Sequence, residues 1–150
     1  MNIKYSFRLL LIATAFSSSA LASLGDLESS IDHDSETLRA KHRVSKGAGY
    51  TIHQLKTSTS TVVEYVSSAG SVFEVTWRGA GMPDLSTLLG ANYTDYTIER
   101  AKLAKTHSRE ASEVKTAKMI VSSSGHMRYI HGRAYIPDLV PTGIDVRSLK

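Results

Sequence analysis

Apolar and polar residues alternate in two stretches of the chain, which lie on either side of a segment with helical spacing. The first stretch, residues 50–78, is rich in Val, Thr and aromatic residues, which favour β-strands. A three-residue turn at Ser68-Ala69-Gly70 would pair Tyr65 with Phe73 and make a hairpin. The register predicts one apolar face, made of Tyr65, Phe73, Val75 and Trp77.

The second alternating stretch carries a similar turn sequence. Residues 121–125 (VSSSG) resemble residues 66–70 (VSSAG). The same turn rule would pair Val121 with Met127 and Met119 with Tyr129, which predicts a second hairpin. We interpret the likeness as two similar turns and not as an internal duplication.

The segment between the hairpins has the spacing of a helix from about residue 84 to 104. Pro83 suits a first turn, and Asp84 complements the positive end of the helix dipole. Gly90 either ends a short helix or lies within a longer one, so a broken and a continuous helix both fit. Residues 105–115 are polar and predict a loop, and Ile144 and Val146 suggest a short edge strand in the tail.

This order of elements predicts an α+β domain. We expect a mostly antiparallel β-sheet, built from the two hairpins, with one main helix (about 84–104) packed on a face. The apolar hairpin face would then contact Leu85, Leu88, Leu89 and Tyr93. Residues 23–47 are polar with scattered apolar positions and predict a partly helical or flexible lead-in, followed by a single domain over 48–150.

The N-terminal residues have the three parts of a secretory signal peptide. Lys4 and Arg8 precede a short apolar run from Leu9 to Phe16, and Ala20-Leu21-Ala22 supplies small residues for cleavage after Ala22. The run is shorter than the roughly 20 residues that a membrane span needs. We therefore predict residues 1–22 to be a signal peptide, the mature protein to be periplasmic or secreted, and no stable membrane anchor to remain.

Composition narrows the functional classes. The chain has 18 Lys and Arg against 14 Asp and Glu, and cleavage would remove two of those cations. A nucleic-acid partner would need a clustered basic surface, and so small an excess, together with the export signal, argues against such a partner. Cysteine is absent, which excludes thiol enzymes and Cys-ligated metal sites and leaves a packed core as the source of stability.

Two glutamates are candidate catalytic residues. With Tyr65 opposite Phe73, Glu64 would lie close to Glu74 on the other face of the hairpin. Paired carboxyls that share a site acquire different pKa values and can then act as acid and base. The competing interpretation is two solvated glutamates, neutralised by Arg128 or Lys118 of the second hairpin, and it is the one that we favour.

A basic strand, residues 126–133, is a candidate ligand-binding element. Alternation would place His126 and Arg128 on one face and His131 and Arg133 on the other. Arg128, His131 and Arg133 are the candidate anion-binding residues. The competing interpretation is a solvated basic face or a salt bridge from this strand to Glu64 or Glu74.

We expect no metal and no cofactor. Asp32-His33-Asp34 and Glu36 offer ligand atoms, but adjacent residues on a polar segment rarely converge on one ion. The chain contains no nucleophile elbow, phosphate loop or HExxH motif.

Several motifs in order resemble a family of small exported proteobacterial proteins, catalogued as domain of unknown function 2844. The motifs are Leu24-Gly25, TVVEY (61–65), GSVFEVTW (70–77), Pro83-Asp84-Leu85, Leu88-Leu89-Gly90, GRAYIP (132–137), Leu139, Pro141 and Gly143. This chain has Val63 where the family commonly has His. The resemblance supports export and a single domain, and it implies no activity.

These observations favour a non-enzymatic binding or accessory protein of the bacterial cell envelope, with another envelope protein as the expected partner. A small hydrolase or lyase using Glu64 and Glu74 is one alternative. An anion or small-ligand carrier using the basic strand 126–133 is the other.

Overall fold

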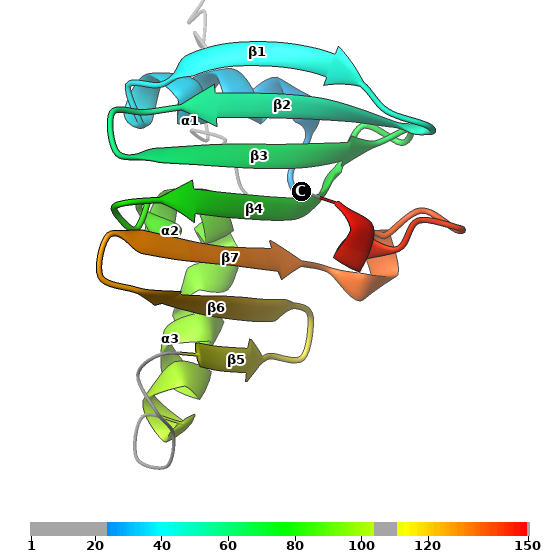
Figure 1. The fold of residues 1–150 in the computed structure, drawn as a ribbon. Coiled ribbons are helices and arrows are strands. Elements are labelled where there is room, and N and C mark those ends of the chain that lie inside the picture. The colour runs from blue at the N-terminus through cyan, green and yellow to red at the C-terminus, as the bar shows by residue number, and fades with distance from the viewer. Residues whose placement is uncertain (1–23, 104–110, 150) are drawn as a thin grey trace, which may run out of the picture.

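The protein folds around one sheet of seven antiparallel strands, in the order β1-β2-β3-β4-β7-β6-β5 (Figure 1). The computed structural model describes residues 24–103 and 111–149, so the predicted signal peptide lies outside the described residues. The strands are β1 (Lys41–Lys46), β2 (Tyr50–Lys56), β3 (Ser60–Ser67), β4 (Val72–Gly79), β5 (Ala111–Lys115), β6 (Ile120–His126) and β7 (Tyr129–Tyr135).

Helices cover one face of this sheet, which we call the helix face. They are α1 (Ile31–Thr37), α2 (Leu85–Leu89) and α3 (Tyr93–Leu103). In Figure 1, α1 lies behind β1 and β2, and the other two helices lie behind β4, β7, β6 and β5. Short 3₁₀ turns complete the described elements: η1 (Glu28–Ser30), η2 (Gly90–Asn92), η3 (Pro137–Leu139) and η4 (Val146–Ser148). Among the described residues, no helix is long and apolar enough to cross a membrane.

The two faces of the sheet have separate apolar clusters. The helix-face cluster includes Ile31 of α1, Leu88 of α2 and Trp77 of β4. A smaller cluster lies on the opposite face, where Tyr65, Phe73 and the tail residue Leu149 pack together. Because residues 136–149 run across this second face, we call it the C-terminal face. Each central strand therefore buries both of its sides.

The α+β class with a mostly antiparallel sheet is confirmed, but the two-hairpin description is too simple. The sheet consists of a four-stranded meander, β1 to β4, and a three-stranded meander, β5 to β7. They join where β4 pairs with β7. Strand β1 and helix α1 lie within the region that we predicted as a lead-in, and Ile31 is fully buried. The folded unit therefore begins well before residue 48.

The first hairpin turns where the sequence predicts, but its register changes one pair later. Val66 pairs with Val72, as the three-residue turn requires, and Tyr65 then pairs with Glu74. Phe73 is thus the extra residue of a β-bulge. The predicted apolar face is consequently split. Tyr65 and Phe73 belong to the C-terminal face, whereas Val75 and Trp77 meet the helices.

The second hairpin turns at a different place from the one predicted. Ser122 to Gly125 continue β6, and the turn falls at Met127 and Arg128, so that His126 pairs with Tyr129. Arg128 has φ 69°, an unusual conformation for a residue other than glycine. Because the chain reverses there, His126 lies on the same face as His131 and Arg133, and the predicted separation of the two histidines is wrong.

The other local predictions have mixed outcomes. The main helix is broken at Gly90, which has φ 48°, into α2 and α3, and Asp84 caps α2 by accepting a hydrogen bond from the Ser86 N–H. Residues 111–115 form β5 and not a loop, while residues 104–110 lie outside the described residues. The tail forms a 3₁₀ turn, η4, where we predicted an edge strand.

Candidate functional site

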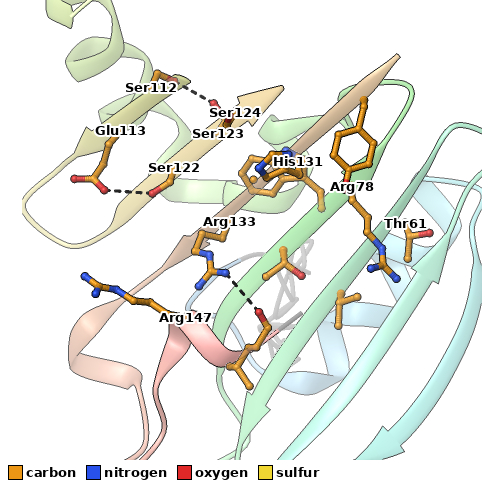
Figure 2. A pocket seen from close by; sticks show the side chains of 16 residues that line it. Thr61, Arg78, Ser112, Glu113, Ser122, Ser123, Ser124, His131, Arg133 and Arg147 are labelled. Atoms are coloured by element: carbon orange, nitrogen blue, oxygen red, sulfur yellow. Dashed lines mark hydrogen bonds between the residues drawn. The ribbon is translucent and has the colours of Figure 1, made fainter. Parts of the chain in front are cut away.

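A hollow of about 710 Å³ opens on the C-terminal face, over β4, β7 and β6 (Figure 2). Its walls come from strands that are distant in sequence, because the β4–β7 pairing brings the two meanders together. We call it the basic hollow. Its lining residues are Thr61, Val63, Thr76, Trp77, Arg78, Ser112, Glu113, Ser122, Ser123, Ser124, Tyr129, His131, Gly132, Arg133, Arg147 and Leu149.

The charge of the basic hollow is mainly positive. Arg78, Arg133 and Arg147 line it from β4, β7 and the tail, together with the exposed ring of His131. Glu113 is the acid of the lining, and Lys115 Nζ neutralises it at 3.1 Å. Within the described part of the chain, neither the Arg78 nor the Arg147 guanidinium has an ion-pair partner. Two guanidinium groups are therefore available to an anion.

Arg133 has a different role, because protein groups already surround it. Its guanidinium lies 3.6 Å from Glu74 Oε1 and donates hydrogen bonds to the backbone carbonyls of Val146 and Leu149. Figure 2 draws Arg133 between the strands and the tail. The residue thus holds the tail across the C-terminal face while one side of its guanidinium faces the basic hollow. The predicted salt bridge from the basic strand to a glutamate is confirmed.

Glu74 lies beneath this arginine and has no solvent exposure. Burial raises the pKa of Glu74 to about 7, although the positive charge of Arg133 opposes the rise and Asp145 adds to it. In the described chain, its carboxyl oxygens accept no hydrogen bond. The ion pair with Arg133 is therefore its main compensation for burial.

A row of three rings borders the basic hollow. The ring centroids of His126 and Tyr129 lie 6.1 Å apart, and those of Tyr129 and His131 lie 5.6 Å apart. Tyr129 is 52% exposed, so its ring can contact an apolar or planar ligand group. Arg128, one of the three predicted anion-binding residues, lies in the β6–β7 turn and is not among the lining residues, whereas His131 and Arg133 are.

The predicted proximity of Glu64 and Glu74 is wrong. The bulge at Phe73 pairs Glu64 with Val75 and Tyr65 with Glu74, which places the two carboxyls on opposite faces of the sheet. Glu64 faces α1, where its partner is Asp34, and Glu74 faces Arg133. The acid–base pair on which the hydrolase or lyase hypothesis depends is therefore absent.

Asp34 and Glu64 form a buried carboxyl pair on the helix face, with 0% and 1% exposure. Burial and the charge of Glu64 raise the pKa of Asp34. Burial likewise raises the pKa of Glu64, and a hydrogen bond from Asp34 partly offsets that rise. Two carboxyls can bond to each other only when one keeps its proton, so the pair as a whole holds a proton between Asp34 and Glu64.

Two histidines form a hydrogen-bonded chain beside this pair. His53 Nε2 donates to Glu28 Oε1 at 2.9 Å, and its Nδ1 lies 3.0 Å from Nε2 of His42. Asp32 Oδ1 lies 3.4 Å from Nδ1 of His42. The two acids of the Asp32-His33-Asp34 segment thus diverge, with Asp32 toward His42 and Asp34 into the core. The described residues contain no group of three or more His, Cys, Asp and Glu that could hold a metal ion.

Sequence reasoning missed Arg78, Arg147 and the carboxyl partner Asp34. Alternation along β4 places Arg78 on the same face as Glu74 and Thr76, so a correct register would have found it. No local signal brings the tail residue Arg147 to the sheet. Asp34 was considered as a metal ligand and not as a core residue, because its segment reads as polar and exposed.

The basic hollow presents guanidinium groups, hydroxyls and an exposed aromatic ring on a rigid sheet, which together suit the binding of an organic anion. The fold and this site define the class: an α+β protein with a seven-stranded antiparallel sheet and a cationic hollow on one face. A family model matches residues 20–149, and the chain belongs to the family described as "Protein of unknown function (DUF2844)". Comparison with curated proteins and with solved structures finds no match.

Proposed function

We propose that the protein is a non-enzymatic binding protein of the cell envelope that holds a small organic anion in the basic hollow. The observation that carries the proposal is the pair of guanidinium groups, Arg78 and Arg147, which line the basic hollow without an ion-pair partner among the described residues. Arginine binds carboxylate and phosphate groups through paired N–H donors, so these are the anionic groups that we expect.

The remaining lining suggests the rest of the ligand. Val63 and Leu149 offer apolar surface, and Tyr129 offers an exposed ring. Hydroxyls of Thr61, Thr76 and Ser122 offer weaker polar contacts. A hollow of about 710 Å³ is within the usual size range of small-molecule sites. We therefore expect a ligand with one or two acidic groups on an apolar or aromatic body.

Titration calorimetry with citrate, phosphate and an aromatic carboxylate such as 4-hydroxybenzoate tests the proposal. At least one probe should bind, and the Arg78→Gln and Arg147→Gln variants should each weaken binding tenfold or more, since a hydrogen bond to a charged group is worth about 1.5–3 kcal/mol. Arg43→Gln is the matched control, because Arg43 is an exposed arginine of β1 outside the basic hollow. Equal losses in all three variants would indicate nonspecific charge attraction and refute the site.

A partner protein that adds a strand to the sheet is the competing mode of binding. Among the described strands, β1 is at the edge of the sheet, so its outer side could pair with a strand of a partner. Its exposed Lys41, Arg43 and Lys46 are charges of the kind that protect a sheet edge from nonspecific strand addition. Crosslinking in cells from a photoreactive residue at position 45, compared with one at position 131, distinguishes the modes. A single envelope protein captured only from position 45 would favour strand addition over ligand binding.

Location in the envelope rests on the secretory pattern of residues 1–22. Mass spectrometry of the protein from fractionated cells should find Ser23 as the N-terminal residue in the periplasmic or extracellular fraction. A full-length chain in the cytoplasm would refute the envelope part of the proposal and leave the anion site to be judged separately.

A further inference from the structure

The buried carboxyl pair, Asp34 and Glu64, is a costly arrangement unless something neutralises it. Two ionised carboxylates in a dry site repel each other, and each loses its hydration. In the described part of the chain, no N–H or hydroxyl group donates a hydrogen bond to either carboxyl. Each carboxyl finds its partner in the other.

Among the described residues, no lysine or arginine pairs with either carboxyl. His53 is the cross-strand neighbour of Glu64, but its two ring nitrogens are occupied by Glu28 and His42. Asp26 also acts on Asp34, and as an acid it raises the pKa of that carboxyl further. Helix α2 brings no charged residue, because its sequence is LSTLL. The surroundings therefore favour protonation of the pair.

Helix α1 depends on this contact because it has little stability of its own. It has seven residues, well below the roughly 12 that an isolated helix needs. Its N-cap residue, Ser30, provides no side-chain cap hydrogen bond. Two buried side chains, Ile31 and Asp34, attach it to the sheet. One of its two anchors thus belongs to a carboxyl pair that must keep a proton.

We infer that α1 is a proton-held latch, docked on the helix face while Asp34 and Glu64 share a proton and released when that proton is lost. Release would uncover Ile31 and neighbouring apolar residues of the helix-face cluster. The protein would then present a pH-controlled apolar surface on the face opposite the basic hollow. This inference is independent of the proposed anion site.

The direction of the pH effect follows from the raised pKa values of the pair. A carboxyl whose pKa is higher in the docked state stabilises docking below its ordinary pKa of about 4. That stabilisation is lost as the pH rises toward the raised value. Between these limits, the equilibrium constant for the opening of α1 should increase about tenfold per pH unit for each proton released.

Amide hydrogen exchange measured by NMR tests the latch. The reporter is the Leu38 N–H, which donates to the Asp34 carbonyl at 2.8 Å at the end of α1. After correction for the intrinsic exchange rate, its protection should fall about 100-fold between pH 5 and 7. Protection of amides in β3 and β4 should stay higher than that of Leu38 throughout, because α1 opens without the sheet.

Variants identify the groups responsible. Asp34→Asn supplies an N–H donor to Glu64 at every pH, so the protection of Leu38 should become nearly independent of pH. Glu36→Gln is the matched control, since Glu36 is an exposed acid on the same helix, and it should keep the wild-type dependence. If Asp34→Asn does not fold, Glu64→Gln makes the same test, and carbon-13 NMR of the wild-type carboxyls reports their titration directly.

Three results would overturn the inference. Protection of Leu38 that is constant between pH 5 and 7 would show that no proton holds the helix. Equal protection in α1 and in β3 would show that the helix opens only when the whole protein unfolds. Titration of both carboxyls in the ordinary range would show that the pair shares no proton.

Discussion

The two faces of the central hairpin bury one glutamate each and neutralise it in different ways. Glu64, on the helix face, meets Asp34, and the pair is satisfied by a proton. Glu74, on the C-terminal face, meets the guanidinium of Arg133 at 3.6 Å. Both carboxyls are fully buried on adjacent strands. Burial raises the pKa of both carboxyls, and the group brought against each one decides whether a shared proton or a cation compensates that burial.

The largest effect is expected when Arg133, the cation that neutralises Glu74, is removed. Arg133→Met leaves Glu74 buried without its partner, which should lower the free energy of unfolding by about 3 kcal/mol at pH 8. The loss should be smaller at pH 5, because Glu74 can then take up a proton. Urea denaturation at both pH values measures the effect. The double variant Arg133→Met/Glu74→Gln should recover much of the loss, and its failure to do so would assign the loss to the tail contacts of Arg133.

A substitution on β7 tests how tightly the helix face is packed. A Cβ on Gly132 would lie 2.4 Å from Trp77 Cζ2 and 2.7 Å from the Ser122 carbonyl oxygen. Gly132→Ala should therefore cost about 2–3 kcal/mol of stability and shift the Trp77 fluorescence, since overpacking displaces the indole. Gly81→Ala is the control, because its nearest neighbour is the Thr59 side chain at 3.3 Å. Similar costs for both variants would contradict the tight contact with Trp77.

The pH dependence of overall stability separates the two neutralising mechanisms. Glu74 and the Asp34–Glu64 pair all have raised pKa values, so each stabilises the fold at low pH and loses that contribution as the pH rises. For Glu74 the loss should run from its ordinary pKa of about 4.3 to about 7, at about 1.4 kcal/mol per pH unit. Urea titrations between pH 5 and 9 measure the slope. Glu74→Gln and Asp34→Asn should each reduce the slope below pH 7, and Asp34→Asn should also remove the part that extends above it.

The smallest expected effect concerns Asp84, a carboxyl whose pKa is lowered and not raised. Asp84 caps α2, and hydrogen bonds from Ser86 are the main cause that lowers its pKa. Its stabilisation is present above its ordinary pKa and is lost as the pH falls. Asp84→Ala should cost about 1 kcal/mol at pH 7 and less at pH 3, as measured by thermal unfolding. An equal cost at both pH values would show that the cap does not depend on the charge.

The sequence predicted what short-range patterns control. The turn at Ser68-Ala69-Gly70 was predicted from residues that favour it, and the helix break at Gly90 was one of the two outcomes that the sequence allowed. The bulge at Phe73 has no such signal, yet it moves Glu74 to the opposite face from Glu64. The turn at Arg128 lacks a glycine or proline, so the glycine-containing segment 122–125 was mistaken for it.

The candidate site was predicted in part. The basic strand supplied His131 and Arg133, because charged residues that alternate along a strand share a face. Arg147 and Asp34 reach the sheet through tertiary contacts of segments whose own sequences read as polar and exposed. Contacts between segments distant along the chain have no local signature, and the sites on both faces depend on them.

The pairing of β4 with β7 also has a consequence for the order of folding. Every other strand pair joins neighbours in the chain, so each of the two meanders can form by closing short loops. The β4–β7 seam instead brings Glu74 opposite Tyr135 and requires closure of a long loop that includes α2, α3 and two strands. Contact order therefore predicts that this seam forms last and limits the folding rate. In that sequence of events, the basic hollow assembles only in the final step.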